Sequence, residues 1–126
     1  MTSKAAASPS TVIVLAMHGL PPRDFPPAEL AELMTLGARL GHGPTAAPPE
    51  LARRHAELDA RIRSWPRTAA NDPFWAGAQM LALRLRRETH WPVVVGFNDF
   101  CGPSLDEALD LDPDGNTWMV QEVRRR

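Results

Sequence analysis

The chain has 126 residues, a length that suits one domain, and its 14 basic and 15 acidic side chains leave a formal net charge of -1. So balanced a charge argues against a dedicated nucleic-acid binder, whose phosphate contacts need an excess of basic side chains. No apolar run approaches the roughly 20 residues of a transmembrane helix. The single cysteine, Cys101, excludes an internal disulfide and fits a reducing compartment, so we expect a cytoplasmic protein.

Two short apolar runs are typical of strands in a parallel sheet. Residues 1–10 carry one lysine, small residues and a proline, which predicts a flexible tail before one α/β domain over 11–126. "TVIVLAM" at 11–17 is continuously apolar and rich in β-branched residues, as expected for a strand buried on both faces. "VVVGF" at 93–97 has the same character. We therefore predict two buried strands.

Segments whose apolar residues recur at helical spacing lie between these strands and after the second one. The predicted helices cover 27–40, 50–64, 71–90 and 102–109, with a last helical stretch over 117–126. Asp72 and Pro73 have the residue types of an N-cap and a first helical position. The order strand, helices, strand, helix predicts a parallel crossover. Because two strands form a poor sheet, we expect further strands to come either from a second copy, paired through exposed strand edges as a homodimer, or from a larger design of which this chain is a part.

Polar residues follow both predicted strands where each ends. His18 comes directly after the first strand, and Asn98 and Asp99 follow the second. Ligands of parallel α/β sheets bind beyond the carboxyl ends of the strands, so these residues should meet at one edge. Imidazole and carboxylate together suit a divalent first-row metal or a proton acceptor beside it. The alternative is that His18 only caps its strand by hydrogen bonding.

The remaining polar candidates have simpler interpretations. His42 is predicted in a loop, His55 as a half-buried packing residue and His90 at a helix end. Cys101 could be a soft metal ligand, although a small buried hydrophobe is the preferred interpretation. Arg67 could meet a carboxylate through two hydrogen bonds, and a solvated side chain is the alternative.

A hydrolase and a nucleotide-binding protein both find little support. The nearest approach to the G-x-S-x-G elbow of α/β-hydrolases is "GPSLD" at 102–106, which ends in Asp and is not placed directly after a strand. Neither G-x-G-x-x-G nor a P-loop occurs in the sequence.

Two long segments of the sequence resemble the amino-terminal part of the sirohydrochlorin chelatase family. They are "VIVLAMHGLPPRDFP" and "WPRTAANDPFWAGAQMLALRLRRETHWPVVVGFNDFCGPSLDEAL". Members of this family, the class II chelatases, insert cobalt, nickel or iron into tetrapyrroles. The resemblance implies a chelatase-like parallel sheet flanked by helices, with an open cleft for the macrocycle. It also implies an enzyme of the lyase class whose divalent metal is a substrate, with no permanent cofactor.

Individual residues acquire roles through this resemblance. His18 matches the family histidine that takes the metal and helps to deprotonate the pyrroles, and Asp99 stands where the family usually has a glutamate. Both are therefore expected as catalytic and metal-binding residues. Because the carboxylates of a tetrapyrrole favour a cationic or polar rim, Arg23, Arg67 and Asn98 are the candidates for that rim.

The sequence departs from the family pattern after residue 109. The family continues with a third strand and a Gly-Gly-x-His segment that carries a second histidine, which has no counterpart in this sequence. We therefore expect an incomplete chelatase-like sheet. The alternative function is a non-catalytic module that binds a tetrapyrrole or a metal.

Overall fold

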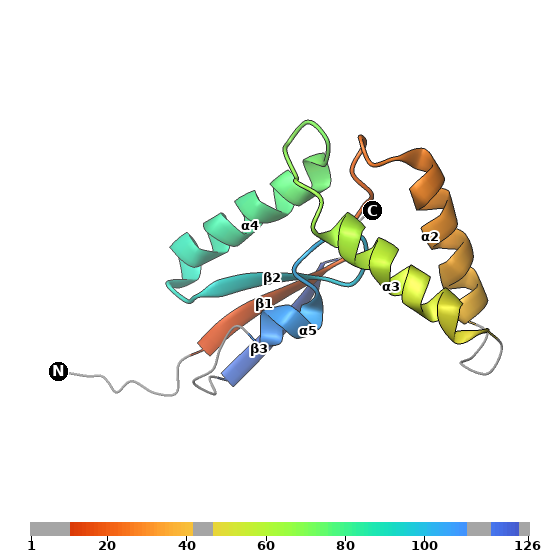
Figure 1. Ribbon diagram of the computed structural model, residues 1–126. Helices are drawn as coiled ribbons and strands as arrows, with labels where there is room; N and C mark the ends of the chain where they lie inside the picture. The colour runs from red at the N-terminus through yellow and green to blue at the C-terminus, as the bar shows by residue number, and fades with distance from the viewer. Residues whose placement is uncertain (1–10, 42–46, 111–116, 124–126) are drawn as a thin grey trace.

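The computed structural model describes residues 11–41, 47–110 and 117–123, the last range as backbone only. These residues form three strands and four helices (Figure 1). In chain order they are β1 (Thr11–Met17), α2 (Pro27–Leu40), α3 (Pro49–Arg63), α4 (Pro73–Thr89), β2 (Val93–Phe97), α5 (Leu105–Leu109) and β3 (Thr117–Val123). The predicted flexible tail at 1–10, the loop around His42 and the basic end at 124–126 lie outside the described residues.

The three strands form a parallel sheet in the order β2-β1-β3. In the pairing of β1 with β2, Ile13 lies opposite Val93 and Met17 opposite Phe97. Both strands therefore end at the same level, as the α/β prediction required. The coarse α/β class is confirmed, and the pairing of two copies through strand edges stays a prediction.

The prediction of a last helix over 117–126 was wrong for Thr117–Val123, which is strand β3. This strand pairs with β1 along its whole length, from Thr11 opposite Thr117 to Met17 opposite Val123. Its sequence, "TWMVQEV", is rich in β-branched and aromatic residues, which favour a strand once a partner is present. The expectation of only two strands in the chain is corrected in the same way.

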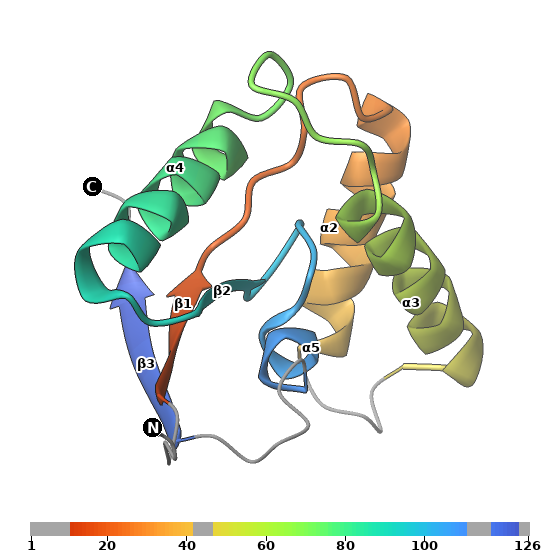
Figure 2. The same ribbon diagram turned by 90° about the vertical axis from the view of Figure 1, so that its left-hand side faces the viewer.

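Helices α4 and α5 cover opposite faces of the sheet. On one face, alternate residues of β1 and β2 pack against Ala78 and Ala82 of α4. On the other face Gly96 lies against α5, where an added Cβ would meet the Cα of Leu105 at 2.8 Å and the Cβ of Ala108 at 3.1 Å. Figure 2 shows α4 and α5 on either side of the strands. The apolar runs of both strands are therefore explained by burial on two faces.

Helices α2 and α3 form a hairpin beyond the carboxyl ends of the strands (Figure 1). Their apolar faces make a second core, in which Leu33 and Leu36 of α2 meet Leu58 and Ile62 of α3. Phe100, from the loop that follows β2, packs against this second core. The hairpin is thereby attached to the edge of the sheet where the sequence predicts a site.

Local helix signals are confirmed in most cases. Asp72 is the N-cap of α4, with its Oδ1 accepting from the amide of Trp75 at 2.9 Å, and Pro73 opens the helix. Helix α5 is shorter than predicted, because Ser104 is its N-cap and residues 102–103 precede it. Among the helices that the structure describes, none is both long enough and apolar enough to cross a membrane.

Candidate functional site

The ends of β1 and β2 bring the two main candidate residues together. The amide of Asn98 donates to the carbonyl of Met17 at 2.7 Å, which extends the pairing of the strands by one residue. Directly after it, the amide of Gly19 donates to Oδ1 of Asp99 at 2.7 Å. Nδ1 of His18 lies 3.8 Å from Oδ2 of Asp99. The predicted meeting of imidazole and carboxylate at one sheet edge is confirmed.

Gly19 makes this close approach possible. A Cβ at this position would lie 1.9 Å from the carbonyl oxygen of Asp99 and 3.0 Å from the Cβ of Cys101. Contacts of 1.9 Å between heavy atoms do not occur without a covalent bond, so any side chain here would push the two strand exits apart. The glycine after the histidine is therefore explained by the proximity of the Asp99 backbone.

Both side chains of the pair are accessible from solvent. The exposed fractions are 54% for the side chain of His18 and 46% for that of Asp99. Of the two carboxylate oxygens, Oδ1 is engaged by the Gly19 amide, and Oδ2 is the one that lies nearer to the imidazole. A nitrogen and an oxygen of two partly exposed side chains therefore lie 3.8 Å apart.

The separation of these two atoms is compatible with one shared metal ion. Bonds from zinc-like ions to imidazole nitrogen and carboxylate oxygen are about 2.0–2.2 Å long, so two ligand atoms of one ion are about 3.4 Å apart at a tetrahedral angle and about 4.2 Å apart when they lie on opposite sides of the ion. The 3.8 Å between Nδ1 of His18 and Oδ2 of Asp99 lies between these two values. In the part of the chain that the structure describes, no third His, Cys, Asp or Glu joins them to make a metal-binding group.

Cys101 is a core residue, as preferred from the sequence. Its side chain lies in the core between the sheet and α4 and is 1% exposed. Burial raises the pKa of its thiol above the ordinary value. A buried, protonated thiol is a poor metal ligand, because the thiolate is the species that binds metal.

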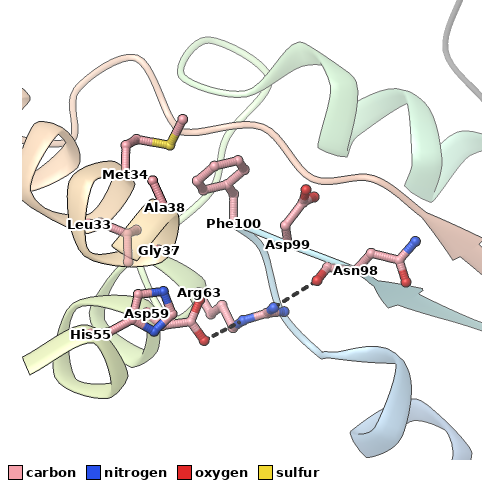
Figure 3. Close-up of a pocket in the computed structure, with 10 residues that line it drawn as sticks. All are labelled: Leu33, Met34, Gly37, Ala38, His55, Asp59, Arg63, Asn98, Asp99 and Phe100. Atoms are coloured by element: carbon pink, nitrogen blue, oxygen red, sulfur yellow. Dashed lines mark hydrogen bonds and ion pairs between the residues drawn. The ribbon is translucent and has the colours of Figure 1, made fainter. Parts of the chain in front are cut away.

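A cavity of about 540 Å³ opens beside Asp99, between the helical hairpin and the loop after β2 (Figure 3). The lining comes from three elements of the chain. The residues are Leu33, Met34, Gly37 and Ala38 of α2, His55, Asp59 and Arg63 of α3, and Asn98, Asp99 and Phe100 of the loop. The residues that α2 contributes are therefore apolar or glycine, and the polar lining residues come from α3 and the loop.

Arg67 is not a rim residue, which corrects its predicted place. Its side chain is 4% exposed and forms an ion pair with Asp72, whose side chain is 2% exposed. It also donates to the carbonyls of Leu20 at 2.9 Å and Ile62 at 2.7 Å, and to that of Phe100. The guanidinium therefore donates to groups within the protein and links the loop after β1, the end of α3 and the loop after β2. The predicted contact with a carboxylate occurs within the protein.

Asn98, Arg23 and His90 lie in three different parts of the structure. Asn98 is exposed and lines the cavity beside Asp99. Arg23 is exposed but lines a different hollow, formed with Trp65 and Asn71, and is not brought next to Asp99. His90 is the C-cap of α4, with a φ of 61°.

His55 is half-buried, as predicted, but it also lines the cavity. Its Nε2 lies 3.5 Å from the place that a Cβ on Gly37 would occupy. The helical spacing placed His55 on the inner face of α3, and it could not indicate that part of this face borders a cavity.

Arg63 is a site residue that the sequence interpretation missed. Its side chain extends from the end of α3 to the loop that carries Asp99, as Figure 3 shows. The only local signal is Asp59 four residues earlier, a spacing that is usually a surface ion pair on a helix.

Comparisons of this chain with models of protein families, with curated proteins and with solved structures find no match.

Proposed function

We propose that this protein inserts a divalent metal, of the class cobalt, nickel or iron, into sirohydrochlorin or a related tetrapyrrole. The observation that carries the proposal is the His18–Asp99 pair, whose nitrogen and oxygen lie 3.8 Å apart at the carboxyl edge of a parallel sheet. The resemblance of the flanking segments to the chelatases supplies the reaction class. The metal is a substrate in this scheme.

His18 and Asp99 have complementary tasks in the proposed reaction. Insertion exchanges two pyrrole N–H protons for one divalent ion, so the site must hold the ion and accept protons. Two protein ligands bind an ion more weakly than the three or four of a resident metal site, which lets the ion leave for the ring. Once the ion has left, the imidazole of His18 is free to accept one of the two protons, and the other passes to water.

The cavity beside Asp99 offers a place for one edge of the ring. A flat, largely apolar macrocycle needs a concave apolar wall with a few polar groups, and α2 supplies the wall through Leu33, Met34 and Ala38. Met34 is 54% exposed, which is more than a core methionine would be and is consistent with a contact surface. Asn98 supplies a polar rim on the opposite side.

A metallation assay tests the proposal. The purified chain is mixed with sirohydrochlorin and Co²⁺, and insertion is followed by the change in the absorption spectrum of the ring. We expect His18→Asn to slow insertion about a hundredfold or more, the typical loss when a general base is removed. His90→Asn is the matched control, because it removes an exposed imidazole at a helix C-cap where Asn is tolerated. Equal rates for both variants would contradict the proposal.

One observation favours a second candidate, a non-catalytic module that binds a tetrapyrrole or a metal. The family's second histidine has no counterpart in this sequence, and among the described residues no second histidine forms a metal-binding group with His18 and Asp99. In the same assay this module would bind the ring, seen as a spectral shift without metal, and would not accelerate insertion over the rate in buffer.

A further inference from the structure

The loop that follows β2 has an unusual set of main-chain partners. The carbonyls of Phe97, the last residue of β2, and of Asn98 and Cys101 in the loop accept from Arg63, and that of Phe100 accepts from Arg67. The carbonyl of Asp99 accepts from the amide of Cys101 at 2.7 Å. Five successive carbonyls thus have donors within the protein, and two arginines provide four of these hydrogen bonds.

Arg63 is the central member of this set. Its donors pair with Oδ2 of Asp59 at 2.9 Å and with the carbonyls of Phe97 at 3.2 Å, Cys101 at 2.9 Å and Asn98 at 3.0 Å. Its side chain is 20% exposed. Because a guanidinium is a rigid planar fork, contacts on several sides fix the loop relative to α3 more closely than a flexible ammonium could.

The conformation of the loop shows why it needs such support. Phe100 has a φ of 59°, in the left-handed region that non-glycine residues rarely adopt. Asp99 directly precedes this residue, and the backbone on either side of Asp99 is held by Arg63 through Asn98 and Cys101. The direction of the Asp99 side chain therefore depends on contacts that lie on the α3 side of the loop.

We propose that Arg63 is a positioning residue, which keeps the carboxylate of Asp99 beside His18 by clamping the carbonyls of the loop from the side of α3. Asp59 orients the guanidinium by accepting a hydrogen bond from Nε of Arg63 through its Oδ2. The effect on metal rests on the proposed function, whereas the effect on the geometry of Asp99 does not. The two parts have separate tests.

The geometric part is tested through the amide of Gly19, which donates to Oδ1 of Asp99 and has no need of metal. In Arg63→Met, we expect its hydrogen exchange, measured by NMR, to become faster by about tenfold or more, as in a local opening. The amides in the interior of β1, such as that of Leu15, should keep their rates. A merely structural role would accelerate the strand and Gly19 together.

Two further variants complete this test. Arg53→Met, on the same helix, removes an exposed arginine that has no described contact with the loop, and it should leave the Gly19 amide unchanged. Arg63→Lys keeps the positive charge without the fork and should give an intermediate rate, which preserves the test if Arg63→Met does not fold. A Gly19 amide that exchanges as slowly in Arg63→Lys and Arg63→Met as in the wild type would overturn the inference.

The metal part is tested by titration of each variant with Co²⁺. Removing a residue that orients a metal ligand typically weakens binding about 10- to 100-fold, and we expect this loss in Arg63→Met and not in Arg53→Met. If Gly19 responds as expected but the wild type binds no Co²⁺, the positioning role of Arg63 stands and the proposed function fails. If the wild type binds Co²⁺ and neither Gly19 nor the affinity responds to Arg63→Met, the positioning role fails alone.

Discussion

The amide of Gly19 donates to the carboxylate of Asp99 at 2.7 Å across a separation of 80 residues. This bond joins the exits of β1 and β2 at the level where His18 emerges. It gives Asp99 one fixed oxygen and leaves the other near the imidazole.

Gly19 and Gly77 should respond in opposite directions to replacement by alanine. At Gly19 a Cβ would lie 1.9 Å from a main-chain oxygen, and we expect Gly19→Ala to cost about 3 kcal/mol or more of unfolding free energy. At Gly77, inside α4, a Cβ would meet nothing within 4 Å, so Gly77→Ala should stabilise by about 0.5–1 kcal/mol. Urea unfolding measures both, and a Gly19→Ala variant as stable as the wild type would contradict the packing described.

Arg67→Met should be strongly destabilising, because the charged side chain that it replaces is buried and paired. It leaves the carboxylate of Asp72, 2% exposed, without its partner, and breaking a buried pair from one side costs about 3–5 kcal/mol. Adding Asp72→Asn removes the stranded charge and keeps an N-cap oxygen, so the double variant should recover part of the loss. Thermal unfolding compares them with Arg23→Met, an exposed arginine that should change little.

Glu107 should contribute to the loss of stability in acid. Its pKa is lowered by the hydrogen bond from the amide of Ser104, at 2.8 Å in the capping box of α5. A carboxylate with a lowered folded-state pKa stabilises above its unfolded value of about 4.3, and this contribution disappears as the pH falls through the folded-state pKa. Urea unfolding at a series of pH values should show a shallower acid limb for Glu107→Gln than for the wild type. Parallel acid limbs would mean that the capping box is not formed in solution.

The two buried strands could be predicted from sequence because a continuous β-branched run bounded by His18 or Pro92 has few alternatives. The helices between them predicted that the two strands run parallel. The parallel direction in turn predicted that His18 and Asp99 meet at one edge of the sheet. Strand β3 could not be predicted in the same way. "TWMVQEV" is short and mixed in polarity, and only its pairing with β1 decides for a strand.

The contacts of Arg63 and Arg67 could not be predicted from local sequence patterns. Arg67 donates hydrogen bonds to Leu20 and Phe100, which are distant in sequence, and to Asp72, the N-cap of α4. No spacing rule relates Arg67 to these partners, so the sequence could not indicate that its side chain is buried. For Arg63, the partner four residues earlier in the helix was the only visible signal. Main-chain carbonyls are present at every residue, and a sequence pattern does not show which of them a side chain will meet.

The central claim, that His18 and Asp99 bind a divalent metal together, is tested most directly by titrating the purified chain with Co²⁺ and following its visible absorption. We predict binding in the wild type that weakens in both His18→Asn and Asp99→Asn. The double variant should be little weaker than either single one, because either change dismantles the shared site. His90→Asn and Asp110→Asn, matched exposed positions, should bind as the wild type does. Co²⁺ binding that is the same in the wild type and in the double variant would contradict the account.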